Sequence, residues 1–228
     1  LDNGQRTPLD VAHLQIVIAA ACTGLSADVK AEPIVAETLR NLYDGVPVDE
    51  VYKAAILAAR TLIERDPDYT YVTARLLLHT IVREVLGRGV QPGEMQAAYM
   101  DHFPAFVQKG VDNELLNPDL LSFDLPRLAA ALRAERDQQF DYLGLQTLYD
   151  RYFLHVNKAR IELPQSFFMR VAMGLALRED DRNARAIEFY ELLSSFDFMS
   201  STPTLFNSGT LRSQLSSCYL TTVPDELG

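Results

Sequence analysis

The feature that most constrains the fold is a run of apolar residues at helical spacing between Tyr69 and Leu86. Pro67 precedes this run and Gly87 follows it, and both residue types interrupt helices. The apolar positions share one face of a helix, because their offsets follow the 3.6-residue period: Ala74, Leu77, Leu78, Ile81 and Val85. The run therefore predicts an amphipathic helix that belongs to a packed bundle.

Three further helices are predicted before this run. Each ends at a glycine, a proline or an Asp-Gly turn, and their expected bounds are Leu9–Leu25, Ala31–Tyr43 and Val48–Arg65. With the helix at Tyr69–Leu86 they form a four-helix domain that we expect to cover residues 1–90. The fold class predicted for the chain is therefore mainly α.

The rest of the chain divides into three expected parts. Residues 91–141 are predicted to be an acidic helical connector, with a short alanine-rich helix at Leu128–Arg136. Residues 142–200 are predicted to be a second helical domain, and residues 201–228 change to Ser, Thr, Pro and Gly. Within these parts we expect a helix at Leu145–Tyr152, a hairpin turning at Asn157-Lys158, a helix starting at Pro164, a helix at Asn183–Ser195 and a strand at Leu215–Val223.

Composition excludes several classes of function. The chain has 228 residues and a formal net charge of −10, which gives no long-range attraction to a phosphate backbone, so we expect no nucleic-acid partner. No apolar run reaches the length of about 18 residues that a membrane-spanning helix needs, so we expect no membrane association. The first residues lack a secretion signal and an initiator Met, and both ends of the chain look cut.

Cysteine and histidine usage points to a reducing compartment without a metal. The only two cysteines, Cys22 and Cys218, lie far apart in the sequence, which suits the cytoplasm rather than a disulfide framework. The four histidines form no cluster with cysteine, so no metal site is predicted. Cys22, in a helix of the first domain, is a poor partner for a redox thiol at Cys218.

Cys218 lies in the stretch STPTLFNSGTLRSQLSSCYL, and two interpretations of it stay open from the residues alone. In the first, Cys218 is a small apolar residue packed inside the protein. In the second, it is a thiol at the centre of a group that hydrogen-bonds a sugar or a phosphate. The hydroxyl groups for the second interpretation would come from Thr204, Ser208, Ser216 and Ser217, if the chain folds back through Gly209.

This stretch resembles the opening of the catalytic barrel in the large (α) subunit of class I ribonucleotide reductases. The segments YLGLQTLYDRYFL, LPQSFFMRVAMGLA and FDFMSSTPTLFNSG resemble the helical domain that precedes that barrel. The segments LYDGVPVDEVYKAAILAARTLI and DPDYTYVTARLLLH resemble the ATP-cone, a four-helix regulatory module at the N-terminus of many such subunits. The resemblance implies an ATP-cone-like domain, a helical domain and the first strand of a ten-stranded α/β barrel.

The resemblance also implies a chemistry and its partners. The family reduces ribonucleoside diphosphates to 2′-deoxyribonucleotides by thiyl-radical chemistry, and ATP or dATP is the expected effector of the parent protein. Cys218 would be one of two cysteines that deliver electrons and become a disulfide, while Thr204, Ser217 and Cys218 would hold the substrate. A small (β) subunit would carry the radical cofactor, thioredoxin or glutaredoxin would be the reductant, and large subunits would self-associate. The partner cysteine would lie beyond Gly228, so the chain alone is predicted to be inactive.

The cone is expected to be degenerate. The family's basic pair falls on Leu1 and Asp2 beside Gly4, and its Thr and His positions fall on Val48 and Tyr52. Losing two cations removes attraction to a triphosphate. Two lysines, Lys30 and Lys53, are weak candidates for effector contacts.

Two alternatives stand beside this interpretation. The chain could act only as an oligomerisation and interaction module that binds no nucleotide. It could also belong to the cobalamin-dependent class of the same reductase, which uses a similar barrel.

Overall fold

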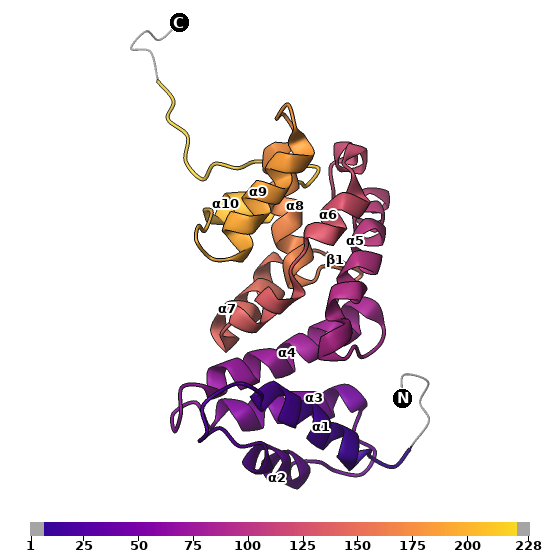
Figure 1. Ribbon diagram of the computed structural model, residues 1–228, viewed down its shortest axis with the longest axis vertical. Helices are drawn as coiled ribbons and strands as arrows, with labels where there is room; N and C mark the ends of the chain where they lie inside the picture. The colour runs from indigo at the N-terminus through magenta and orange to yellow at the C-terminus, as the bar shows by residue number, and fades with distance from the viewer. Residues whose placement is uncertain (1–6, 223–228) are drawn as a thin grey trace, which may run out of the picture. The chain divides into compact units, whose positions relative to one another are not determined.

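Helices make up nearly all the regular structure of residues 7–222, which are the residues that the computed structural model describes (Figure 1). This confirms the mainly α fold class. The chain forms two compact units, unit 1 from Leu1–Gln96 and Arg133–Leu163, and unit 2 from Ala97–Leu132 and Pro164–Gly228. The division of the sequence at residues 90, 141 and 200 stays a prediction.

The first four helices of unit 1 lie where the sequence predicted them, with earlier ends for three of them: α1 Val11–Cys22, α2 Glu32–Arg40, α3 Val48–Arg60 and α4 Tyr69–Leu86. Local signals set their ends. The Asp10 side chain accepts the His13 backbone N–H at 2.8 Å and caps α1, and Gly87 ends α4 in the left-handed conformation with φ 69°.

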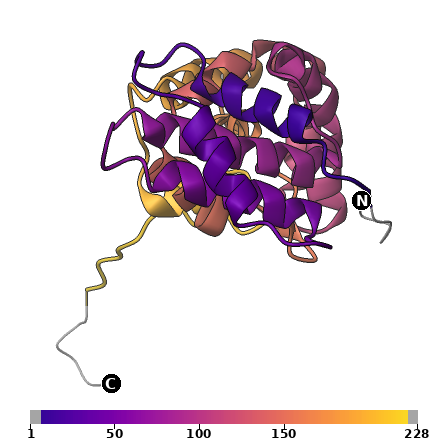
Figure 2. The ribbon, with the colours of Figure 1, turned by 90° about the horizontal axis from the view of Figure 1, so that it is seen from below.

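Helix α4 is the centre of unit 1. It packs against α1 and α3, and α2 packs against α3 and α1, so that the four helices cover one another's apolar faces. Figure 2 shows these helices, coloured indigo to purple, from below. Of the apolar face predicted for α4, Ala74, Leu77, Leu78 and Ile81 are buried, whereas Val85 is half-buried.

The later part of unit 1 packs on α4. It contains the 3₁₀ turns η1 Pro92–Glu94 and η3 Ala134–Gln139, helix α7 Tyr142–Thr147, a π-helical turn η4 Leu148–Tyr152, and the antiparallel pair β1 His155–Val156 and β2 Ala159–Arg160. The hairpin turns at Asn157 and Lys158, which both have positive φ, so its predicted position is confirmed. Glu84 of α4 accepts hydrogen bonds of 2.7 Å from the Tyr149 hydroxyl and from the Arg160 backbone N–H.

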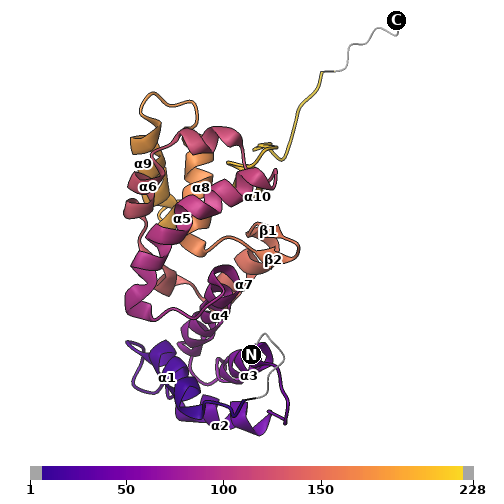
Figure 3. The same ribbon diagram turned by 90° about the vertical axis from the view of Figure 1, so that its right-hand side faces the viewer.

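Unit 2 is built around α8 Pro164–Ala176, which packs against α9 Arg182–Ser194 (Figure 3). The other elements are α5 Met95–Asp112, whose first two residues belong to unit 1, η2 Pro118–Ser122, α6 Leu125–Ala131 and α10 Thr202–Asn207. A buried polar network joins α5, α8 and α9: Tyr190 Oη donates to Gln165 Oε1 at 2.7 Å, and the Gln165 backbone N–H donates to Tyr99 Oη at 3.2 Å. Such a network fixes the register of packed helices.

The C-terminal stretch differs from its prediction in two ways. Thr202–Asn207 forms the helix α10, which was not among the predicted helices. Residues 215–222 form no strand, so the strand predicted at Leu215–Val223 is wrong for the part of it that the structure describes. An isolated extended segment has no neighbour to accept and donate its backbone hydrogen bonds, which explains the second difference.

Candidate functional site

The candidate site is the stretch from Ser201 to Thr222, which carries the predicted site residues Thr204, Ser217 and Cys218. Helix α10 begins after Ser201, whose backbone is extended, and has Pro203 in its first turn. Proline is suited to this position because the N–H it lacks would have no helical partner there. Ser, Thr and Pro therefore begin a short helix here rather than a loop.

A buried cation holds the end of α10. Arg170 on α8 is fully buried, and its NH1 donates to the Ser208 carbonyl at 2.7 Å. NH1 and NH2 also lie 3.5 and 3.4 Å from the Leu205 carbonyl oxygen. These carbonyls end a helix and have no helical partner, so a cation is favourable at this position. No local sequence pattern predicts this contact.

Two glycines let the segment lie directly on α8. Gly209 has φ 76°, a conformation that glycine adopts without strain. A Cβ added at Gly174 would collide with the backbone N of Gly209 and with Ser208. The Ser208 hydroxyl donates to the Val171 carbonyl at 2.7 Å and is fully buried, so it serves the packing and is not turned toward the thiol as expected.

A short antiparallel contact continues the anchoring. The Asn117 N–H donates to the Gly209 carbonyl at 3.0 Å, and the Leu211 N–H donates to the Leu115 carbonyl at 3.0 Å. Leu116 and Thr210 are the paired residues of this isolated bridge. These hydrogen bonds therefore hold the chain up to Leu211 against the segment Leu115–Asn117 of the same unit.

Beyond Leu211 the chain folds back over α10. The Asn207 side-chain amide donates to the Gln214 carbonyl at 2.7 Å, and the Thr204 hydroxyl donates to the Leu215 carbonyl at 3.4 Å. Thr204 also lies 3.3 Å from the Ser201 hydroxyl. The structure thus brings Thr204 close to the start of the Ser-Ser-Cys run.

The thiol of Cys218 is exposed, which contradicts its interpretation as a packed core residue. The Ser217 hydroxyl lies 3.6 Å from Cys218 Sγ. Both residues belong to the part of the segment without regular structure, and the structure shows no hydrogen bond from either to Thr204. The roles of the three residues in catalysis and substrate binding stay predictions.

Cys22 has the opposite environment. It ends α1 and is partly buried, and this burial raises its pKa to about 11, opposed by the charge of Arg75. Both cysteines are free thiols. Cys22 is therefore a weak nucleophile at neutral pH.

The predicted effector residues of unit 1 do not form a cluster of cations. Lys30 and Lys53 are exposed, and Lys53 Nζ lies 2.8 Å from Glu50 Oε1, a bond that raises the Lys53 pKa. Tyr52, at the expected His position, is buried, with its ring 4.8 Å from His79 and under Arg83 at 5.1 Å. Val48 begins α3, whereas Leu1, Asp2 and Gly4 lie outside the described residues.

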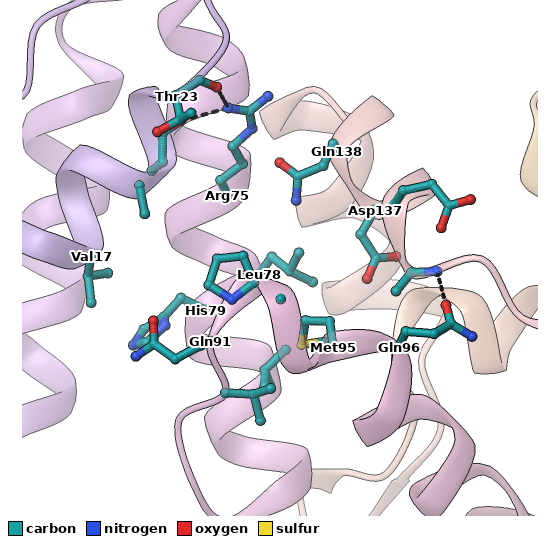
Figure 4. Close-up of a pocket in the computed structure, with 18 of the residues that line it drawn as sticks. Val17, Thr23, Arg75, Leu78, His79, Gln91, Met95, Gln96, Asp137 and Gln138 are labelled. Atoms are coloured by element: carbon teal, nitrogen blue, oxygen red, sulfur yellow. Dashed lines mark hydrogen bonds between the residues drawn. The ribbon is translucent and has the colours of Figure 1, made fainter.

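Among the described residues of unit 1, side chains line cavities of which two are large enough for a small molecule. One, of about 720 Å³, includes Tyr52, Lys53, Arg83 and Arg160 together with the acidic Asp49 and Glu84. Within it, burial and the hydrogen bond to Glu84 raise the Tyr149 pKa to about 12. The other, of about 550 Å³, lies among α1, α4, η1 and η3 and is drawn in Figure 4. Sequence reasoning missed both cavities because neither has a motif.

The described residues offer neither a cluster of side chains for a metal ion nor a helix that could span a membrane. Residues 7–222 contain no group of three or more His, Cys, Asp or Glu placed to hold a metal ion. In the same range, the helices are too short or too polar to cross a bilayer.

Comparison with known proteins identifies the relatives of the chain. A family model described as "Ribonucleotide reductase, all-alpha domain" matches residues 138–213. The ribonucleoside-diphosphate reductase subunit alpha of Chlamydia muridarum is 47% identical over 220 residues, which are 95% of this chain and 21% of the relative. The subunit alpha of Helicobacter pylori is 37% identical over 228 residues, which are 99% of this chain and 28% of the relative. The large subunit of Danio rerio is 34% identical over 215 residues, which are 92% of this chain and 26% of the relative. The chain thus spans between 21% and 28% of the length of these relatives.

Replacing Gly174 by alanine should destabilise unit 2. The new methyl group has no space against Gly209 and Ser208, and forcing extra volume into a packed site costs about 1–3 kcal/mol in the free energy of unfolding. Gly93→Ala is the control, because an added Cβ there meets nothing within 4 Å. Urea unfolding of the two variants measures the difference. Equal stability of Gly174→Ala and the unmodified chain would contradict the close contact.

The two thiols should react at very different rates. With a pKa of about 11, Cys22 is a thiolate in about one molecule in a thousand at pH 8, and it is also partly buried, whereas Cys218 is exposed. Reaction with a disulfide reagent at pH 8 should therefore show one fast thiol. Cys218→Ser should remove the fast phase, and Cys22→Ser should keep it. A fast phase that survives in Cys218→Ser would show that the exposure of the two thiols is reversed.

Proposed function

We propose a function for the chain on the premise that the comparisons give, namely that it belongs to the large-subunit family of ribonucleotide reductases. The proposed function is to supply the helical part and the first active-site segment of a large subunit that reduces ribonucleoside diphosphates to 2′-deoxyribonucleoside diphosphates. The observation that carries it is the anchored segment after α10, which leaves the thiol of Cys218 exposed beside the Ser217 hydroxyl.

In this proposal Cys218 is one of two cysteines that supply the electrons for removing the 2′-hydroxyl group. Oxidation of the two thiols to a disulfide releases two electrons and two protons, which balances the loss of the hydroxyl as water. The second cysteine and the radical-forming cysteine would come from residues after 228. Thr204 and Ser217 would bind the substrate through their hydroxyl groups. The resemblance implies thiyl-radical chemistry, and residues 201–228 would lead into the first strand of the catalytic barrel.

Arg170 is proposed to position this segment. It contacts neither Thr204 nor Cys218 in the described hydrogen bonds, but it binds the carbonyls of Leu205 and Ser208 at the end of α10. By holding these two carbonyls, Arg170 would determine the direction in which the backbone continues after Ser208. A change at Arg170 would therefore alter how the substrate-binding residues are placed rather than the chemistry of the thiol.

The proposed partners follow from the names of the relatives and from the family. The relatives are named as α or large subunits, so a small (β) subunit that carries the radical cofactor is the proposed partner, with self-association of large subunits. Thioredoxin or glutaredoxin would return the disulfide to two thiols. The two free cysteines suit a reducing compartment, and we propose a cytoplasmic location.

The four-helix part of unit 1 is proposed to be a cone-like regulatory domain that does not bind ATP or dATP. Tyr52 is packed between His79 and Arg83, and the charge of Lys53 is paired with Glu50. In the cavity beside them, Asp49 and Glu84 offset part of the positive charge of Lys53, Arg83, Lys158 and Arg160. Effector control of the parent protein would then come from another site.

Cys218→Ser in the complete large subunit should abolish deoxynucleotide formation with the small subunit and a dithiol reductant. The change removes one of the two thiols that supply electrons, while Cys22→Ser should retain turnover because its thiol is not used. The measurement is the yield of deoxynucleoside diphosphate per enzyme. Multiple turnovers by Cys218→Ser would sink the proposed role, and any product from the 228-residue chain alone would contradict its expected inactivity.

The 228-residue chain should not bind ATP or dATP. Isothermal titration of either nucleotide should show no saturable heat at micromolar concentrations, because the described residues offer no unpaired cluster of cations at the predicted positions. The double variant Leu1→Lys and Asp2→Arg adds back the family's basic pair, and a gain of affinity in that variant alone would support a site that has lost its charge. Micromolar binding by the unmodified chain would overturn the degenerate cone.

A further inference from the structure

Arg75 on α4 is a half-buried cation that uses only part of its hydrogen-bonding capacity. Its NH1 donates to the carbonyls of Ala21 at 2.9 Å and Thr23 at 2.8 Å, at the C-terminal end of α1. Its Nε is buried and has no hydrogen-bond partner among residues 7–222. The guanidinium also forms no ion pair with any carboxylate that the structure describes. The guanidinium is thus held in place through NH1, while its Nε is left without an acceptor.

Burying a hydrogen-bond donor without an acceptor costs free energy, so a ligand that accepts a hydrogen bond from Arg75 would be favoured. Burial lowers the pKa of Arg75, which reflects the cost of holding its charge away from water. Arginine offers a planar pair of N–H donors that matches the two oxygens of a carboxylate. Because NH1 is already fixed on α1, little further ordering of the side chain is needed when an acceptor binds.

Arg75 lines a cavity of about 550 Å³, which is within the range of small-molecule sites. Figure 4 shows Arg75, Leu78, Met95 and Gln138 around one space. Most of the wall is apolar and comes from α1, α4 and the segment at residues 90–95: Ile16, Val17, Ala20, Leu78, Val82, Val90 and Met95. The ligand that fits these walls has an apolar body.

The charges around the cavity limit the ligand to a single negative charge. Arg75 is the only cation of the lining, and Glu135 and Asp137 line the side formed by η3. His79 also lines the cavity, and burial, with the charges of Arg83 and His13, lowers its pKa to about 4, so its ring is neutral at pH 7. One carboxylate matches Arg75, whereas a polyphosphate would meet the two acidic side chains without further cations.

We propose that this cavity binds a small amphipathic monocarboxylate. Its carboxylate would accept hydrogen bonds from the guanidinium of Arg75, and its apolar body would lie among α1, α4 and residues 90–95. The His79 Nε2 atom, which is also buried without a partner in the described structure, adds a second polar contact for the ligand. This site is separate from Thr204, Ser217 and Cys218 and does not depend on the proposed reductase function.

Isothermal titration of the 228-residue chain with 4-phenylbutyrate tests the proposal. The two matched probes are 4-phenylbutanol and 4-phenylbutylamine, which keep the apolar body and change only the charged group. We expect saturable binding of the carboxylate to one site, at least about tenfold tighter than binding of the alcohol, because a charge-assisted hydrogen bond is lost. Equal binding of the alcohol or the amine, or no saturable binding of the carboxylate at low millimolar concentration, overturns the proposal.

Two substitutions locate the site. Ala20→Phe fills the cavity from an exposed position on α1, and we expect at least about tenfold weaker binding of 4-phenylbutyrate. Ala36→Phe is the matched control, because Ala36 is exposed on α2 and does not line the cavity. Arg75→Lys keeps the charge and removes the planar edge, and should also weaken binding. Circular dichroism checks that each variant folds, and unchanged affinity in a folded Ala20→Phe variant overturns the assignment.

Discussion

The second unit depends on a buried guanidinium. Arg170 lies where water cannot solvate it, and a charge in such a place is tolerated only with acceptors around it. Carbonyls of Leu205 and Ser208 meet this need, and the ring of Phe167 lies 5.2 Å away. The same contact gives the carbonyls at the end of α10 a partner that the helix does not provide. The turn at Gly209, the bridge to Leu116 and the course of the chain toward Cys218 all follow from this one arrangement.

Arg75 in the first unit provides a useful contrast. Both arginines extend from a long helix to the C-terminal carbonyls of another helix, where the helix dipole favours a cation. Arg170 is enclosed by protein on all sides, so its role is structural. Arg75 is only half-buried, and it lines a cavity whose walls are mostly apolar. The same helix-end contact thus supports packing in one unit and a recognition site in the other.

The sequence predicted the parts of the fold that local rules govern. The bounds of α4, the hairpin turn at Asn157-Lys158 and the start of α8 at Pro164 agree with the structure, because periodicity and helix breakers act within a few residues. Helix α10 was missed because its hydroxyl-rich sequence is typical of loops, and its end is held by Arg170, which is distant in the sequence. The strand expected after Leu215 required neighbours that these residues do not have. In the candidate site the residue types were recognised, but only the structure could show that Ser208 is used for packing while Cys218 is exposed. The cavity at Arg75 is formed by four separate segments, and no single one of them carries a pattern that reveals it.

The hydrogen bonds of Glu84 have a mechanical consequence. Its two carboxylate oxygens hold two different pieces of chain, the ring of Tyr149 and the backbone of Arg160, and both pieces come long after α4 in the sequence. A displacement of the last turns of α4 would therefore move the hairpin in the same direction, because both hydrogen bonds connect them. Within the first unit, one acidic side chain thus ties Tyr149 and the hairpin to the central helix.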